Sequence, residues 1–229
     1  MTLARIFLVA ALLFVSPAWS AEPAALVTCQ LPKDGAWAKY RMTAGRPNDD
    51  KKHEMEVTIA AVGTVEKDGK SFRWIRASTG KPNAVFGEFL IPADSLDLPA
   101  PFSHFVEGTA SRNDSPIKPA DVDQAMESPA CMILLGYLSD ARLVDQQKVT
   151  VAGKEQACQH LEGNTSWVGR PARGNLLIEA EVWFSPTTHF GMVKNRLVAT
   201  LDKGGQQRPF GVFQLELLAE GVDEKLIKK

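Results

Sequence analysis

The chain has 229 residues, of which 45% are hydrophobic and 23% charged, and its 26 basic and 27 acidic residues give a formal net charge of −1. A near-neutral chain without a basic block lacks the electrostatic footprint of a nucleic-acid-binding protein or a polybasic membrane patch, so we expect no nucleic-acid partner. About 210 residues remain after the N-terminal segment, which suits one β-rich domain or two small ones. Because no low-complexity linker interrupts them, we predict one.

The N-terminus has the pattern of an export signal. Residues 1–5 carry one positive charge and residues 6–15 form an unbroken apolar run. Small residues, Ala18 and Ser20, then stand at the −3 and −1 positions of a cut ahead of Ala21. A run this short does not anchor a protein permanently across a bilayer. The alternative interpretation is an ordinary buried N-terminal helix.

We therefore predict a signal peptide over residues 1–20, cleaved between Ser20 and Ala21, and a single domain over residues 21–229. Cleavage removes one basic residue and no acidic one, which changes the net charge from −1 to −2. The expected location is periplasmic or secreted, without a permanent membrane span.

The three cysteines leave several interpretations open. In an oxidising compartment, one pair among Cys29, Cys131 and Cys158 could form a disulfide and leave one free thiol. The sequence does not choose among the three pairings. Equally, all three could be small buried apolar residues. No CxxC spacing indicates a redox motif or a thiolate zinc site.

The first half of the mature chain predicts a meander of strands. Alternation over residues 37–42 places Trp37 and Lys39 on one face and Ala38 and Tyr40 on the other. The dipeptide Asp68-Gly69 predicts a two-residue hairpin, because both central positions of a type I′ turn need positive φ. The other strands predicted here cover residues 54–65, 71–77 and 84–91.

The middle of the chain has a different character. We predict a helical turn over residues 92–96, leave 102–118 unassigned and predict a helix over 119–126. Residues 130–138 are apolar nearly all round, which is typical of a buried helix. These two helices could cover the concave face of a sheet.

Strands resume after the middle segment. Ser185-Pro186 ends one of them, because proline brings no N–H to a ladder, and a short constrained corner leads to Gly191 and the next strand. The tail, residues 223–229, is charged and expected to fray. The predicted strands cover residues 148–151, 156–162, 176–184, 191–201 and 211–218, with turns at Gly153-Lys154 and Gly204-Gly205.

This order of elements predicts an α+β, β-rich fold: one strongly curved antiparallel sheet with helices packed on its concave face. The interior of such a fold is apolar and can double as a ligand cavity. The alternative is that the same apolar residues simply fill the core.

The sequence shows no catalytic or metal-binding motif. The four histidines are scattered and none belongs to HExxH, while GxSxG and the P-loop pattern are absent. We therefore predict a non-enzymatic protein with no cofactor, no metal and no catalytic residues. His189, in the predicted corner, is the histidine of most interest, although a solvent-facing loop histidine is the explanation that we favour. The histidines are His53, His104, His160 and His189.

Aromatic residues in the predicted strands are the remaining signal. Aromatic rings suit apolar cavities, although core packing explains most of them, and we expect two or three to line a pocket. The cavity candidates are Trp37, Tyr40, Phe72, Trp74, Phe86, Phe89 and Trp183.

Several segments together resemble a largely uncharacterised family of exported bacterial proteins of planctomycete type, which in overall layout looks like the LolA/LolB lipoprotein carriers. The corner supplies the family-motif residues Ser185, Pro186, Phe190, Gly191 and Lys194. The matching segments are residues 34–40 (DGAWAKY), 62–65 (VGTV), 72–75 (FRWI), 151–154 (VAGK) with Cys158, 182–186 (VWFSP) and 190–194 (FGMVK).

The resemblance implies a curved antiparallel half-barrel closed by helices, with a hydrophobic cavity for acyl chains or another apolar ligand. The first functional hypothesis is a periplasmic carrier or sensor that binds a lipid or a lipoprotein acyl chain. The second is a structural or protein-interaction module of the cell envelope without a ligand, whose partners are unknown. A hydrolase ranks third, because it needs a polar constellation that the sequence does not show.

Overall fold

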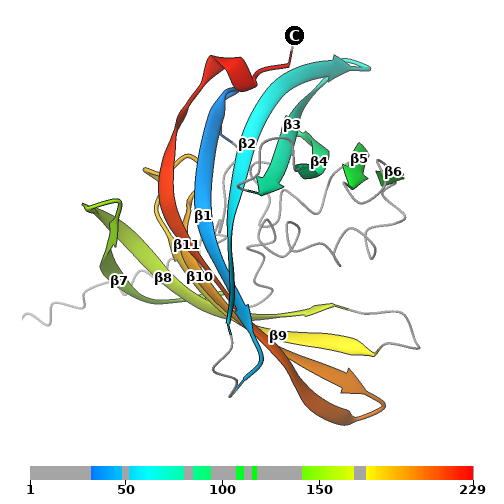
Figure 1. Cartoon of the computed structure of the whole chain (residues 1–229), viewed down its shortest axis with the longest axis vertical. Helices are drawn as coiled ribbons and strands as arrows, with labels where there is room; N and C mark the ends of the chain where they lie inside the picture. The colour runs from blue at the N-terminus through cyan, green and yellow to red at the C-terminus, as the bar shows by residue number, and fades with distance from the viewer. Residues whose placement is uncertain are drawn as a thin grey trace, which may run out of the picture.

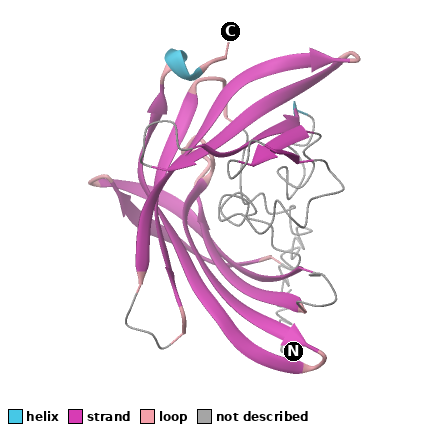
Figure 2. Ribbon diagram, turned by 45° about the vertical axis from the view of Figure 1, so that its right-hand side comes forward, coloured by secondary structure: helices cyan, strands magenta, loops and turns pink. Residues whose placement is uncertain are grey.

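One antiparallel sheet organises the computed structural model, which describes residues 32–47, 52–79, 85–93, 107–110, 115–117, 141–167 and 174–228. Its eleven strands lie in the order β6-β5-β4-β3-β2-β1-β11-β10-β9-β8-β7. Strands β1 to β6 form one antiparallel meander and strands β7 to β11 form another. The pairing of β1 with β11 joins the two meanders into one sheet. The sheet is strongly curved and open, as Figures 1 and 2 show.

The predicted strands are all present, and most are longer than predicted. Their bounds are β1 (Ala36–Gly45), β2 (His53–Lys67), β3 (Lys70–Thr79), β4 (Val85–Pro92), β5 (Glu107–Ala110), β6 (Ser115–Ile117), β7 (Arg142–Val151), β8 (Lys154–Trp167), β9 (Asn175–Phe184), β10 (Met192–Lys203) and β11 (Gln206–Val222).

Two kinds of strand escaped the sequence analysis. The short strands β5 and β6 lie in the stretch left unassigned, and the first six residues of β7 carry no apolar alternation because they are exposed at the edge of the sheet. The β-rich curved sheet is confirmed. The helices predicted over residues 119–126 and 130–138 lie outside the described residues.

Three hairpins use left-handed backbone conformations, and the β10–β11 turn does so at the predicted Gly204 and Gly205, with φ of 64° and 81°. Asp68 and Gly69 have φ of 50° and 72°, as a type I′ turn requires. In the β7–β8 hairpin the same role falls to Ala152 and Gly153, with φ of 48° and 78°. The turn therefore lies one residue earlier than predicted, and Lys154 is already in β8.

Paired residues on neighbouring strands share a face, so the register sorts the side chains. One face carries apolar rows, such as Phe89, Ile75 and Ala61 across β4, β3 and β2. The opposite face carries rows of charged residues. In one row the charges alternate, through Glu56, Arg41, Glu216 and Lys194 across β2, β1, β11 and β10.

The C-terminal segment identifies the charged face as the outer one. The 3-10 helix η4 (Glu224–Leu226) lies outside the curve of the sheet in Figure 2. Lys228, just beyond it, places its Nζ 4.8 Å from the ring centroid of Trp74 and pairs with Glu88. Its backbone N–H donates to the carbonyl of Val62 at 2.6 Å. The tail predicted to fray is therefore packed, which corrects that expectation as far as residue 228.

Candidate functional site

The inner face of the sheet is apolar. A typical row joins Val57, Tyr40 and Leu217, whose exposures are 0%, 0% and 2%. Its few polar groups are paired: the Tyr40 hydroxyl donates to the carbonyl of Met192 at 3.0 Å. The buried Asn195 accepts from the backbone N–H of Leu215 at 3.1 Å. A face of this kind offers an apolar ligand a large contact area, and Arg73, which pairs with Ile91 across β3 and β4, is held by Asp34 at 3.1 Å.

The register distributes the seven aromatic candidates over both faces. Tyr40 and Phe89 are buried on the inner face and belong to the main apolar cluster. Trp183 belongs to the same cluster, but neither it nor the other candidates are placed on the inner face by the register. Trp37, Phe72 and Trp74 alternate onto the outer face, Trp183 lies in the outer row beside Lys194, and the side chain of Phe86 is outside the described residues. Ligand contact by any of the seven stays a prediction.

Four of the five family-motif residues build the corner between β9 and β10, and the fifth, Lys194, lies in β10. The Ser185 N–H donates to the carbonyl of Gly191 at 2.7 Å and closes the loop, and Phe190 is 3% exposed. Gly191 has φ of 75°, and an added Cβ would lie 2.2 Å from the Phe184 ring, so both conformation and space favour glycine here. These contacts are structural. The half-buried His189 donates its backbone N–H to the Glu220 carboxylate at 2.7 Å.

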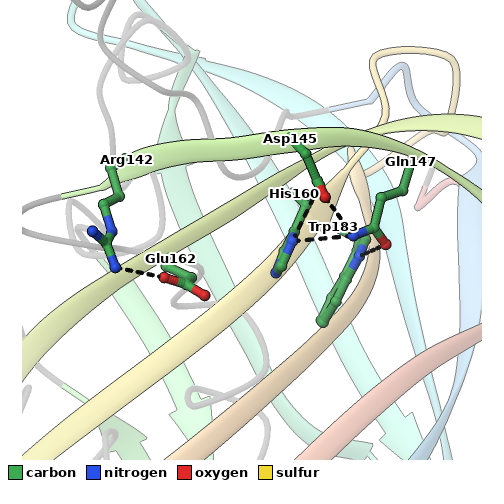
Figure 3. Close-up of polar contacts among 6 residues, drawn as sticks. All are labelled: Arg142, Asp145, Gln147, His160, Glu162 and Trp183. Atoms are coloured by element: carbon green, nitrogen blue, oxygen red, sulfur yellow. Dashed lines mark hydrogen bonds and ion pairs between the residues drawn. The ribbon is translucent and has the colours of Figure 1, made fainter.

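A polar cluster that the sequence did not indicate surrounds Trp183 on β7, β8 and β9 (Figure 3). The Trp183 indole N–H donates to Gln147 Oε1 at 3.0 Å, which fixes the orientation of the amide because the indole can only donate. Gln147 Nε2 then donates to Asp145 Oδ2 at 3.0 Å. The cluster escaped notice because Asp145 and Gln147 fall in the part of β7 without apolar alternation.

His160 lies at the centre of this cluster. Its ring stacks on Trp183 with centroids 4.4 Å apart and planes 4° apart. Its Nδ1 is 3.3 Å from both Asp145 Oδ1 and Gln147 Nε2, so it can donate to the first or accept from the second. In either neutral tautomer Nε2 is buried without a hydrogen-bond partner among the described residues.

Among the described residues, the surroundings of this cluster hold no metal-binding group and one buried thiol. Within the described ranges, no group of three or more His, Cys, Asp or Glu side chains is arranged to hold a metal ion. Cys158, on the same strand as His160, is a buried free thiol whose pKa is raised by burial, against a smaller lowering by the backbone of Val149. A buried protonated thiol is a poor nucleophile.

Beside the cluster, a polar groove of about 510 Å³ crosses β7 to β10 on the outer side. Arg142 pairs with Glu162 at 2.8 Å, as Figure 3 shows, and Arg196 pairs with Glu181 at 3.1 Å. The Arg142 side chain is 77% exposed. Exposed pairs of this kind contribute little to stability, and the groove has the character of a solvated surface.

At the other end of the outer face, Glu88 is held by two cations. Arg76 Nε lies 2.6 Å from its Oε1, and Lys228 pairs with its Oε2. Burial alone would raise the pKa of Glu88, but the hydrogen bonds and charges of Lys228 and Arg76 outweigh it and lower the pKa below 4.5. This carboxylate is therefore a structural anion.

Among known proteins, this chain is similar only to solved structures, and at low sequence identity. No protein-family model matches it, and neither does any curated protein. A candidate lipoprotein from Parabacteroides distasonis is 9% identical with a TM-score of 0.44, over 86% of this chain and 100% of that one. A LolA superfamily protein from Nitrosomonas europaea is 10% identical with a TM-score of 0.30, over 90% and 94%. The MucB structure in complex with MucA(peri) is 16% identical with a TM-score of 0.33, over 85% and 54%.

At these identities and TM-scores no residue role is transferred from any of these solved structures. In the part of the chain that the structure describes, no helix has the length and apolar character to cross a membrane.

Proposed function

We propose that the protein is an exported, non-enzymatic binding protein that holds a lipid-like or acyl ligand against the inner face of its curved sheet. The observation that supports this is the sorting of side chains by the register: apolar rows face inward along the sheet, and charged rows face outward. The periplasmic or secreted location belongs to the same proposal and rests on the signal pattern of residues 1–20.

An acyl chain suits this face because burial of each methylene group contributes about 0.8 kcal/mol and needs no directional partner. The polar side chains of Tyr40 and Asn195 are hydrogen-bonded within the protein. They therefore lose nothing when an apolar ligand lies over them, and a hydrogen-bonding ligand would find few groups to recognise it.

Native mass spectrometry of the mature protein from its own cell envelope tests this proposal, followed by organic extraction. We expect an adduct with the mass of a fatty acid or phospholipid, which solvent releases. A bare protein mass, together with no uptake of a fluorescent fatty acid, contradicts the proposal and leaves the envelope interaction module as the function.

A matched pair of variants locates the ligand. Ala77 lies on the inner face and is fully buried, while its neighbour Ser78 points to the outer face. Ala77→Leu should lower the affinity for a fluorescent fatty acid by about tenfold by filling ligand space, and Ser78→Leu should not. If the inner face is already filled, Ala77→Leu instead destabilises the fold by about 1–3 kcal/mol, which thermal unfolding of both variants would reveal.

A further inference from the structure

The hairpin between β10 and β11 reaches beyond the end of β1, while β9 pairs with β10 as far as Asp202. β1 pairs with β11 only as far as Val212, opposite Gly45. Residues 206–211 of β11 are therefore paired on one side only, with β10. Residues 206–210 are all exposed, and the hairpin, coloured orange to red, forms the lowest point of the molecule in Figure 1.

An aromatic residue is displayed on this hairpin. Ala199 pairs with Gly211 and Thr200 with Pro209, so Phe210 is the extra residue of a β-bulge and is 50% exposed. Its ring centroid lies 6.5 Å from that of Phe213. Phe213 in turn packs against the main apolar cluster. An apolar path therefore connects the exposed tip with the inner face.

Cations without ion-pair partners gather at the same end of the sheet. Lys203 and Arg208 are exposed on the hairpin, and the register places Arg46 and Lys52 at the adjoining ends of β1 and β2. None of these four forms an ion pair with another described residue, whereas Lys39, Arg41 and Arg196 on the outer face all do.

Among the described residues, the acidic groups at this end offset the cations only in part. The Asp202 carboxylate accepts the Gly205 N–H at 2.9 Å and so stabilises the turn of the hairpin. Glu54 is exposed near the start of β2. The six charged side chains named at this end sum to a local charge of +2, on a chain whose formal net charge is −1.

We propose that this tip docks onto the surface of an anionic phospholipid bilayer, with Phe210 in the interfacial layer and the four cations against lipid headgroups. Aromatic rings favour the membrane interface, and each Lys or Arg near an anionic leaflet adds to the attraction. The docking goes beyond the proposed function, because it requires no ligand on the inner face. If both hold, the apolar path from Phe210 to Phe213 marks where an acyl chain enters.

Co-sedimentation of the mature protein with vesicles tests the docking. The vesicles are phosphatidylethanolamine with phosphatidylglycerol, and phosphatidylcholine serves as the neutral reference. We expect binding only to the anionic vesicles, and a loss of binding in high salt because the headgroup contacts are screened. Phe210→Ser should weaken the partition by about fivefold, and Arg208→Glu should weaken it at low salt only.

Matched controls lie at the opposite end of β11. Val222 is 60% exposed, so Val222→Ser removes a comparable exposed apolar group, and Lys225→Glu reverses an exposed charge there. Both controls should bind as the unmodified protein does. Equal binding by Phe210→Ser and Val222→Ser, or equal binding to neutral and anionic vesicles, overturns the proposal.

Sedimentation velocity without vesicles tests whether the tip instead binds a second copy of the chain. If the unmodified chain self-associates and Phe210→Ser does not, the tip is a contact between two copies, and the membrane proposal is wrong. Failure of the fatty-acid binding test leaves the vesicle result unaffected, so the docking and the proposed function fail separately.

Discussion

The outer face contains two tryptophans that each lie beneath a lysine, and their surroundings differ. Lys228 Nζ is 4.8 Å from the Trp74 ring centroid, and Lys194 Nζ is 4.8 Å from that of Trp183. Beside Trp74, the Glu88 carboxylate has both oxygens paired with cations. Beside Trp183, His160 keeps one buried nitrogen without a partner among the described residues.

The difference shows that a similar cation–aromatic contact can belong to two kinds of structure. The Trp74 group joins the C-terminal segment to β3 and β4. The Glu88 carboxylate in it is paired with cations, so the group stabilises the position of the C-terminal segment. The Trp183 group joins the edge strand β7 to β9 through Gln147 and buries a polar atom at a cost. Four variants test this comparison.

The largest effect is expected from truncating the tryptophans. Trp183 is 8% exposed and packs in the main cluster, so Trp183→Ala should lower the free energy of unfolding by about 3–5 kcal/mol. Trp74 is only half-buried, and Trp74→Ala should cost about 1–2 kcal/mol. Urea denaturation measures both. Equal losses would mean that the two groups contribute alike.

Glu88→Gln tests the Trp74 group through the pH dependence of the stability of the fold. The pKa of Glu88 is lowered in the folded protein, so its ionised form stabilises the fold above pH 4.5, and this contribution is lost as the pH falls through the folded-state pKa. At pH 7 the variant should be less stable by about 1–2 kcal/mol.

The difference between Glu88→Gln and the unmodified chain should then shrink steadily on acidification. Thermal unfolding at a series of pH values measures it. A gap that stays constant between pH 7 and pH 3 would show that Arg76 and Lys228 do not stabilise the carboxylate.

The smallest effect on the free energy of unfolding is expected at His160, in the Trp183 group. His160→Phe keeps a ring to stack on Trp183 and removes the unpaired Nε2, while Asp145, half exposed, regains water. The gain and the lost contact should nearly cancel, so the stability should change by less than about 1 kcal/mol. A loss above about 2 kcal/mol in urea denaturation would mean that Nε2 has a partner in the folded protein.

The strands could be predicted where alternation and turn chemistry agree, and the misses have physical causes. Asp68-Gly69 is specified locally, because its backbone conformation depends on its own residues. The start of β7 could not be predicted, because an exposed edge strand needs no apolar side. The tail could not either, since its order depends on contacts of Lys228 with Trp74 and Glu88, which are far away in the sequence.

The same reason limits prediction of the candidate site. Periodicity places Trp37 and Tyr40 on opposite faces, and the structure agrees. Periodicity does not predict which face of one strand will align with which face of the next strand. Bulges decide this, such as the one between Ala61 and Gly63, and they are not visible in the pattern.

The sequence by itself determined most of the strands, the Asp68-Gly69 turn and the alternation of apolar with charged residues, because these depend on neighbours within a few positions. The tertiary structure decided the pairing of β1 with β11, which aligns two meanders into one curved sheet with an apolar inner face. It also brought Arg46 and Lys52 to the end where Arg208 and Phe210 lie, although no basic block exists in the sequence. Such groupings arise only when register joins segments far apart in the chain.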